Sequence, residues 1–130
     1  MITAVDSSII LDVLCNDSIH AENSIALLQK VMAEGKIIVC ECVLAEISPA
    51  LAESDLREFI SDWRIHFVPS TMESALLAGN NFRLYLSRGG RAGRILPDFL
   101  IAAHAQLTAD RLLARDRGYF RDYFRGLKII

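Results

Sequence analysis

Residues 2–14 read ITAVDSSIILDVL, and this stretch predicts a strand, a turn and a helix in succession. Its first four residues are apolar or β-branched, which is typical of a short buried strand. The Asp-Ser-Ser sequence at residues 6–8 can then cap a helix, because these side chains accept hydrogen bonds from free backbone N–H groups. Apolar residues follow from Ile9 to Leu14, as expected for a helix that packs on a sheet.

The same alternation continues along the rest of the chain. Further strands are expected at residues 36–40, 65–68, 112–114 and 127–130. Further helices are expected at residues 21–34, 41–51, 54–63, 71–87 and 97–109. Pro49 should bend or end the helix at 41–51, and Ser54 should cap the next one. We therefore predict the α/β class, with one domain over residues 1–130 and a central parallel sheet flanked by helices on both faces.

The composition predicts a protein without a membrane span. Hydrophobic residues make up 52% of the 130 residues, and the mean hydropathy is +0.30. No uninterrupted apolar stretch approaches the roughly 20 residues that a transmembrane helix requires. The N-terminus lacks the basic and long apolar regions of a secretory signal, so we expect a cytoplasmic protein. The high apolar content of so small a domain also predicts that a second subunit covers part of its surface.

Charge is distributed unevenly along the sequence. Residues 1–80 contain four basic and twelve acidic side chains, a net charge of −8, whereas residues 81–130 contain ten basic and four acidic ones, a net charge of +6. A basic region of this kind can bind phosphate groups, although such asymmetry also occurs without function. The candidate contacts with such phosphate groups are Arg88, Arg91, Arg94 and Arg117. The alternative interpretation is that these arginines are solvated loop residues.

Four acidic residues fall where predicted strands end or the following helices begin. They are Asp6, Glu46, Asp98 and Asp116. In a parallel α/β sheet these points share one edge, which is where ligands bind. Each acid also has an ordinary interpretation: the two acids at helix starts could be caps, Glu46 could face solvent, and Asp116 could be a turn residue. The coincidence of four acids at one edge favours a shared functional site.

A cluster of carboxylates must either take up protons or hold a cation. Two bare carboxylates about 4 Å apart repel each other by roughly 4 kcal/mol at an effective dielectric constant near 20. Because the candidate ligands are oxygen atoms only, Mg²⁺ or Mn²⁺ fits better than Zn²⁺. Magnesium usually binds one or two carboxylates together with substrate phosphate oxygens, and it activates a bound water molecule. The predicted reaction is therefore hydrolysis of a phosphodiester bond.

Four short motifs surround these acids: VDSS at residues 5–8, LAEI at 44–47, PDFLIAAHA at 97–105 and RDR at 115–117. In order and spacing they resemble the acidic motifs of PIN domains, and the chain is similar in size to VapC toxins. The resemblance implies that Asp6, Glu46, Asp98 and Asp116 bind magnesium, with Ser8 assisting by hydrogen bonding. It further implies a metal-dependent endoribonuclease that forms homodimers and is inhibited by a cognate VapB-like antitoxin, whose C-terminal segment covers the active site.

Two positions depart from the family pattern. Ala114 stands where many relatives have Thr or Ser, and Pro49 interrupts the helix that carries Glu46. The first departure removes a hydrogen bond that could place Asp116, which leaves open the alternative of a PIN-like module that binds RNA or protein without cutting. His104 lies six residues after Asp98 and does not share its face of the predicted helix. We therefore expect His104 to pack in the core and not to act as a general base.

Overall fold

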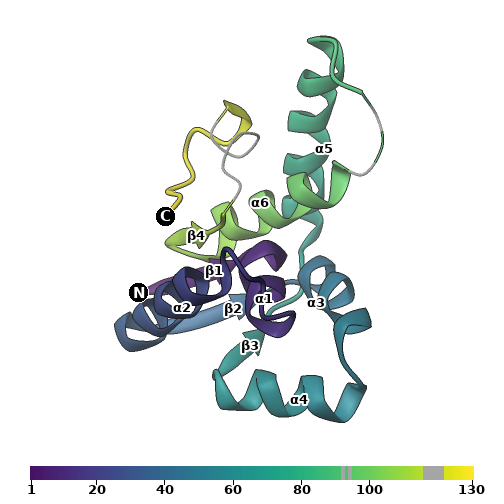
Figure 1. Ribbon diagram of the computed structural model, residues 1–130. Coiled ribbons are helices and arrows are strands. Elements are labelled where there is room, and N and C mark those ends of the chain that lie inside the picture. Colours follow the sequence, from purple (N-terminus) through teal and green to yellow (C-terminus); the bar gives the residue numbers. More distant parts are fainter. Residues whose placement is uncertain (92, 94, 116–121) are drawn as a thin grey trace.

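The computed structural model describes residues 1–91, 93, 95–115 and 122–130. Within these residues the chain forms a four-stranded parallel sheet with the order β3-β2-β1-β4 (Figure 1). The strands are β1 (Ile2–Val5), β2 (Lys36–Val39), β3 (Ile65–Phe67) and β4 (Arg111–Leu113). The predicted α/β class and parallel sheet are confirmed.

Helices connect the strands and lie on both faces of the sheet. They are α1 (Ser7–Leu14), α2 (Ala21–Glu34), α3 (Glu41–Ile47), the 3₁₀ turn η1 (Ser48–Ala50), α4 (Glu53–Asp62), α5 (Met72–Ser87) and α6 (Leu96–Thr108). The crossover from β1 to β2 contains α1 and α2, whereas α5 and α6 carry the chain back from β3 to β4 (Figure 1). Because both crossovers are expected to be right-handed and they run in opposite directions, their helices cover opposite faces. None of the described helices is long and apolar enough to cross a lipid bilayer.

Two helix ends between β2 and β3 test the expectations from Pro49 and Ser54. The α-helix α3 ends at Ile47 and a 3₁₀ turn with Pro49 follows, which confirms that this proline ends the helix, because proline has no N–H to donate. The prediction that Ser54 caps α4 is wrong. The helix begins one residue earlier, after Ala52, which makes no side-chain cap hydrogen bond. The acidic side chains of Glu53 and Asp55 in the first turn instead stabilise the helix start, because they lie near the positive end of the helix dipole.

The C-terminal residues pair with β4 over a shorter length than predicted. The expected strand at residues 127–130 is an isolated parallel bridge between Ile129 and Leu112. The Leu112 amide donates to the Lys128 carbonyl at 2.8 Å, and the Ile130 amide donates to the Leu112 carbonyl at 2.9 Å. The prediction of a full strand is therefore wrong in extent, because β4 is only three residues long and offers few partners.

The core includes an aromatic cluster that fixes the start of α6. Its rings belong to Phe82, Tyr85, Phe99, Tyr123 and Phe124, and the centroids of contacting pairs lie 5.5–6.0 Å apart. Each such pair contributes about 0.5–1.5 kcal/mol beyond the burial of its surface. Further along α6, residues 101–105 are all buried. The aromatic residues near the C-terminus that the structure describes thus pack in or against the core.

Gly35 joins α2 to β2 in a position that has no room for a side chain. Its φ angle is +158°, and an added Cβ would lie 2.0 Å from the Met1 carbonyl oxygen. That oxygen accepts a hydrogen bond from the Lys36 amide at 2.9 Å, next to the pairing of β1 with β2. The close approach of two backbone segments therefore requires glycine.

We expect Gly35→Ala to lower the free energy of unfolding, measured by urea denaturation, by about 1–3 kcal/mol, because the new methyl group meets backbone. Gly79→Ala is the matched control. Nothing lies within 4 Å of a Cβ at this position in α5, so the control should raise the free energy of unfolding by about 0.5–1 kcal/mol. A Gly35→Ala variant as stable as the wild type would contradict this account of the turn.

Candidate active site

Asp6 lies at the carboxyl end of β1, where the order of the strands reverses. From β1 the chain moves to β2 and β3 and then returns to β4 on the other side of β1. Ligands of open α/β sheets bind at such a switch point, outside the carboxyl ends of the strands. The Asp6 amide donates to the Leu113 carbonyl at 2.9 Å, so the backbone of this acid is held against the end of β4.

The side chain of Asp6 is the N-cap of α1. Its Oδ2 atom accepts hydrogen bonds from the Ser8 amide at 3.2 Å and from the Ser8 hydroxyl at 2.5 Å. Asp6 is only 6% exposed, so the carboxylate is largely shielded from solvent as well as oriented. A carboxylate has about four lone-pair positions, so a capping role leaves capacity for other partners. Asp6 therefore acts as a cap and still fits a functional site.

Glu46 reaches the same edge of the sheet through Ser7. Its Oε1 atom accepts a hydrogen bond from the Ser7 hydroxyl at 2.8 Å, which joins α3 to the residue that follows Asp6. The expectation that Glu46 lies early in a longer helix is wrong, because α3 ends at Ile47 and places Glu46 in its last turn. Glu46 is exposed, as its ordinary interpretation expected. The motif did not single out Ser7, although its position directly after Asp6 could have indicated it.

Asp98 is the third residue of α6 and is partly buried. The interpretation of Asp98 as a cap is wrong: the N-cap is Ile95, without a side-chain hydrogen bond, and the Asp98 amide donates to its carbonyl at 3.0 Å. In the first turn of the helix the carboxylate is favoured by the positive end of the dipole. The next residue, Phe99, is 1% exposed and belongs to the aromatic cluster, so the backbone at Asp98 is well fixed.

Two of the four predicted acids thus each bond to a serine at the start of α1. Asp6 bonds to Ser8, Glu46 bonds to Ser7, and the two serines are consecutive residues of α1. Asp116 lies outside the described residues. In residues 1–91, 93, 95–115 and 122–130, no three His, Cys, Asp or Glu side chains form a group that could hold a metal ion. A site of all four acids stays a prediction.

A comparison with protein families matches residues 3–124 to the PIN domain. This chain belongs to the PIN domain family. Its fold is similar to chains in structures of VapBC2 from Rickettsia felis bound to a promoter DNA fragment (20% identity, TM-score 0.76) and of VapBC-1 from nontypeable Haemophilus influenzae (18% identity, TM-score 0.75). It is also similar to a chain of FitAcB from Neisseria gonorrhoeae (19% identity, TM-score 0.70). These alignments cover 100% of this chain and 98%, 97% and 96% of the others. The comparison with curated proteins returned no match.

The arginines predicted to bind phosphate groups are only partly within the described residues. Arg88 and Arg91 are exposed, whereas Arg94 and Arg117 lie outside the described residues. The guanidinium carbon of Arg88 lies 5.5 Å from the centre of the Tyr123 ring, a cation–π contact with the aromatic cluster. Arg88 therefore packs on the domain while its donors stay accessible to solvent.

This PIN domain also contains an ion pair with a buried carboxylate that the motifs did not indicate. Asp12 of α1 is 3% exposed, and its two carboxylate oxygens accept hydrogen bonds from Nε and Nη2 of Arg115 at 3.0 and 3.1 Å. The Ser24 hydroxyl donates to Asp12 Oδ2 at 2.7 Å. The available signal in the sequence was an acid among the apolar residues of ITAVDSSIILDVL, on the helix that follows Asp6.

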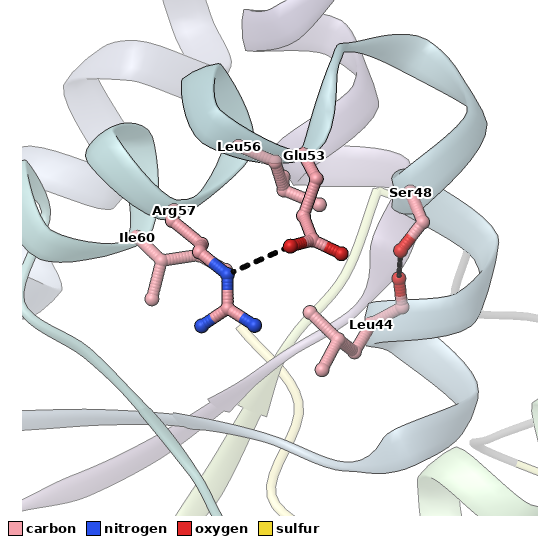
Figure 2. A pocket seen from close by; sticks show the side chains of 6 residues that line it. All are labelled: Leu44, Ser48, Glu53, Leu56, Arg57 and Ile60. Carbon is pink, nitrogen blue, oxygen red and sulfur yellow. Dashed lines mark hydrogen bonds and ion pairs between the residues drawn. The ribbon is translucent and has the colours of Figure 1, made fainter.

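A pocket of about 170 Å³ opens between α3 and α4 (Figure 2). It is lined by Leu44, Ser48, Glu53, Leu56, Arg57 and Ile60. Glu53 and Arg57 form an exposed ion pair at its rim, with an N···O distance of 3.3 Å. Leu44 precedes Glu46 by two residues, and residues two apart point to nearly opposite sides of a helix. The pocket is therefore separate from the contact between Glu46 and Ser7.

His104 lies inside α6 and serves packing, as expected. It is 1% exposed, and its Nε2 atom donates to the Val68 carbonyl at 2.7 Å. Burial lowers the pKa of His104, while its hydrogen bond and the charge of Glu41 act in the opposite direction. The folded state therefore favours the neutral form of the His104 imidazole.

The stability of the protein should depend on pH through His104. Because its folded pKa lies below the unfolded value of about 6.5, the unfolded chain takes up the proton first as pH falls, and stability present above that value is lost below it. We expect the free energy of unfolding to decrease between pH 7.5 and 5.5, and to decrease less in His104→Gln, whose amide can still donate to Val68. The exposed His66→Gln is the control. An unchanged pH dependence in His104→Gln would contradict this assignment.

Proposed function

We propose that this PIN domain is a metal-dependent endoribonuclease and the VapC-type toxin of a toxin–antitoxin pair. The observation that carries the proposal is a pair of hydrogen bonds at the carboxyl edge of the sheet: Ser8 holds Asp6 at the strand switch point, and the residue before it, Ser7, holds Glu46. Family membership supports the same reaction class. Asp98 at the start of α6 and Asp116 after β4 would complete the acid set, and Ser8 would orient Asp6.

The donors fit a hard divalent cation. The side chains of Asp6 and Glu46 offer carboxylate oxygens, which Mg²⁺ and Mn²⁺ prefer as ligands. Bound Mg²⁺ or Mn²⁺ would offset the charge of the phosphodiester and lower the pKa of a water molecule. The carboxylates of this chain would hold the ion, orient that water and accept its proton. The water oxygen would attack phosphorus, the bond to a ribose oxygen would break, and that ribose oxygen would take up a proton from solvent.

RNA is the proposed substrate, and the basic C-terminal part of the chain would bind its backbone. Residues 81–130 contain ten basic side chains against four acidic ones. The exposed residues Arg88 and Arg91 support a backbone-binding role in the described region. Arg94 and Arg117 complete the proposed set. Contacts of this kind position a nucleic acid without reading its bases.

The proposed partners are a VapB-like antitoxin and a second copy of this chain. The similar structures are of VapBC and FitAcB assemblies, which supports the antitoxin. The exposed apolar side chains Met72 and Leu76, 74% and 61% exposed and one turn apart on α5, support a dimer face. A toxin of this type would act in the cytoplasm.

A single species near 14.5 kDa in sedimentation velocity would contradict the dimer. Unchanged cleavage in the presence of the small protein encoded next to this gene would contradict the antitoxin.

The alternative is a PIN-like module that binds RNA or protein without cutting. It draws support from the absence of a three-acid metal group in the described parts of the chain. The two proposals differ in what they require of the acids. Binding without cutting needs no negative charge on Asp6 or Asp98, whereas cleavage by a bound cation does.

Purified protein should cleave RNA with Mg²⁺ or Mn²⁺ and stop when a chelator is added. We expect Asp6→Asn and Asp98→Asn to reduce the cleavage rate at least about 100-fold, because each removes a negative charge from the proposed cation site. Asparagine is itself a good N-cap, so Asp6→Asn should stay folded. The measurement is the single-turnover rate on labelled RNA.

Asp55→Asn is the matched control for Asp98→Asn. Both acids are the third residue of their helix, so the two substitutions remove the same interaction with the helix dipole. Asp55 is an exposed residue of α4, a helix that carries none of the proposed acids, and its variant should cleave at the wild-type rate. Cleavage that survives both Asp6→Asn and Asp98→Asn would reject the nuclease proposal in favour of the binding module.

A further inference from the structure

We infer that Asp12 is a positioning residue for the Asp6 carboxylate and acts through Arg115 and Ser8. This inference rests on the proposed function, because Asp6 is one of the proposed acids. Both oxygens of Asp12 accept hydrogen bonds from the Arg115 guanidinium, at 3.0 and 3.1 Å. A two-point contact of this kind fixes the direction of the arginine as well as its distance.

The network continues from Arg115 to Asp6 in one direction. The Arg115 amide donates to the Ser8 hydroxyl oxygen at 3.4 Å, and this hydroxyl donates to Asp6 Oδ2 at 2.5 Å. These two hydrogen bonds share the Ser8 hydroxyl, so the first polarises the second, and the Arg115 side chain links them covalently to the contact with Asp12. Since Arg115 lies two residues after β4 and Asp6 directly follows β1, the network ties together the two strand ends that border the switch point.

The burial of Asp12 explains how it can hold this geometry. The side chain of Asp12 is 4% exposed and that of Arg115 is 43% exposed, so the carboxylate is the fixed partner and the guanidinium is anchored to it. The Ser24 hydroxyl on α2 donates to Asp12 at 2.7 Å and holds the carboxylate from the other side. Asp12 also neutralises a cation close to the proposed acids. Without this partner, the guanidinium would compete with a divalent ion for the same carboxylates.

The test compares Asp12→Asn with Glu34→Gln, a matched control at the opposite end of β4. Glu34 accepts from Nη2 of Arg111, the first residue of β4, at 3.3 Å, so both substitutions neutralise a helical carboxylate that pairs with an arginine near one end of this strand. Two readouts are measured on the full chain. They are the hydrogen-exchange rate of the Ser8 amide without metal, and the dissociation constant for Mn²⁺ by electron paramagnetic resonance.

We expect Asp12→Asn to speed exchange of the Ser8 amide roughly tenfold, because this amide donates to Asp6 Oδ2. We also expect it to weaken Mn²⁺ binding about tenfold, the size typical of residues that orient metal ligands. Glu34→Gln should change neither value, even if it lowers Tm. Arg115→Gln should weaken Mn²⁺ binding about as much as Asp12→Asn, and the double variant should lose no more than either single one, because both substitutions break the same ion pair.

Ser8 exchange that is unchanged in Asp12→Asn, or equally faster in Glu34→Gln, would overturn the inference whatever the metal does. Additive losses of Mn²⁺ affinity in the double variant would also overturn it. If the wild type binds no Mn²⁺ while Asp12→Asn alone loosens Ser8, the proposed function fails and the positioning network stands.

Discussion

The hydrogen bond from the Asp6 amide to the Leu113 carbonyl is the contact on which the proposed site depends. It extends the parallel pairing of β1 and β4 by one residue, and so it holds a carboxylate at the point where two crossovers diverge. Because all the paired strands run in the same direction, the residues that follow them emerge at one edge. In an antiparallel sheet, successive strands would end at opposite edges and disperse the same acids.

Buried polar groups near this point form connected networks and not isolated contacts. Asp6 bonds to Ser8, and Asp12 bonds to Arg115 and Ser24. A buried carboxylate is costly unless it is paired, and even a paired one adds little net stability compared with apolar packing. The contribution of such groups lies in geometry, because a satisfied network admits few arrangements. This explains how a small parallel sheet can present charged groups rigidly at its edge.

The sequence allowed prediction of those parts of the fold that depend on local pattern. Residues 2–5 and 21–34 were predicted with the bounds they have, because an apolar run and a helical period ending at Gly35 need no distant partner. The cap of α4 was not predicted correctly. Ser54 is a good capping residue, but the helix begins one residue earlier because its first turn is acidic. The strand at residues 127–130 was overestimated, because its length depends on β4.

The candidate site was predictable only as a set of acids at one edge. Their positions after strands or at helix starts could be predicted from local sequence. The contacts that orient them could not, because they join residues that are distant in sequence. Asp12 and Arg115 are 103 positions apart, and Ser7 and Glu46 are 39 apart. Neither separation leaves a periodic signal, so the hydroxyl and guanidinium partners emerge only once the strands are paired.

A crystal of this protein soaked in Mn²⁺ would show in its anomalous difference map whether a cation binds at the sheet edge. We expect a peak at the carboxyl edge of the sheet, within about 2.0–2.6 Å of a carboxylate oxygen of Asp6 and of at least one of the other three acids. A map without a peak at this edge, or with Mn²⁺ bound only elsewhere on the surface, would contradict this expectation.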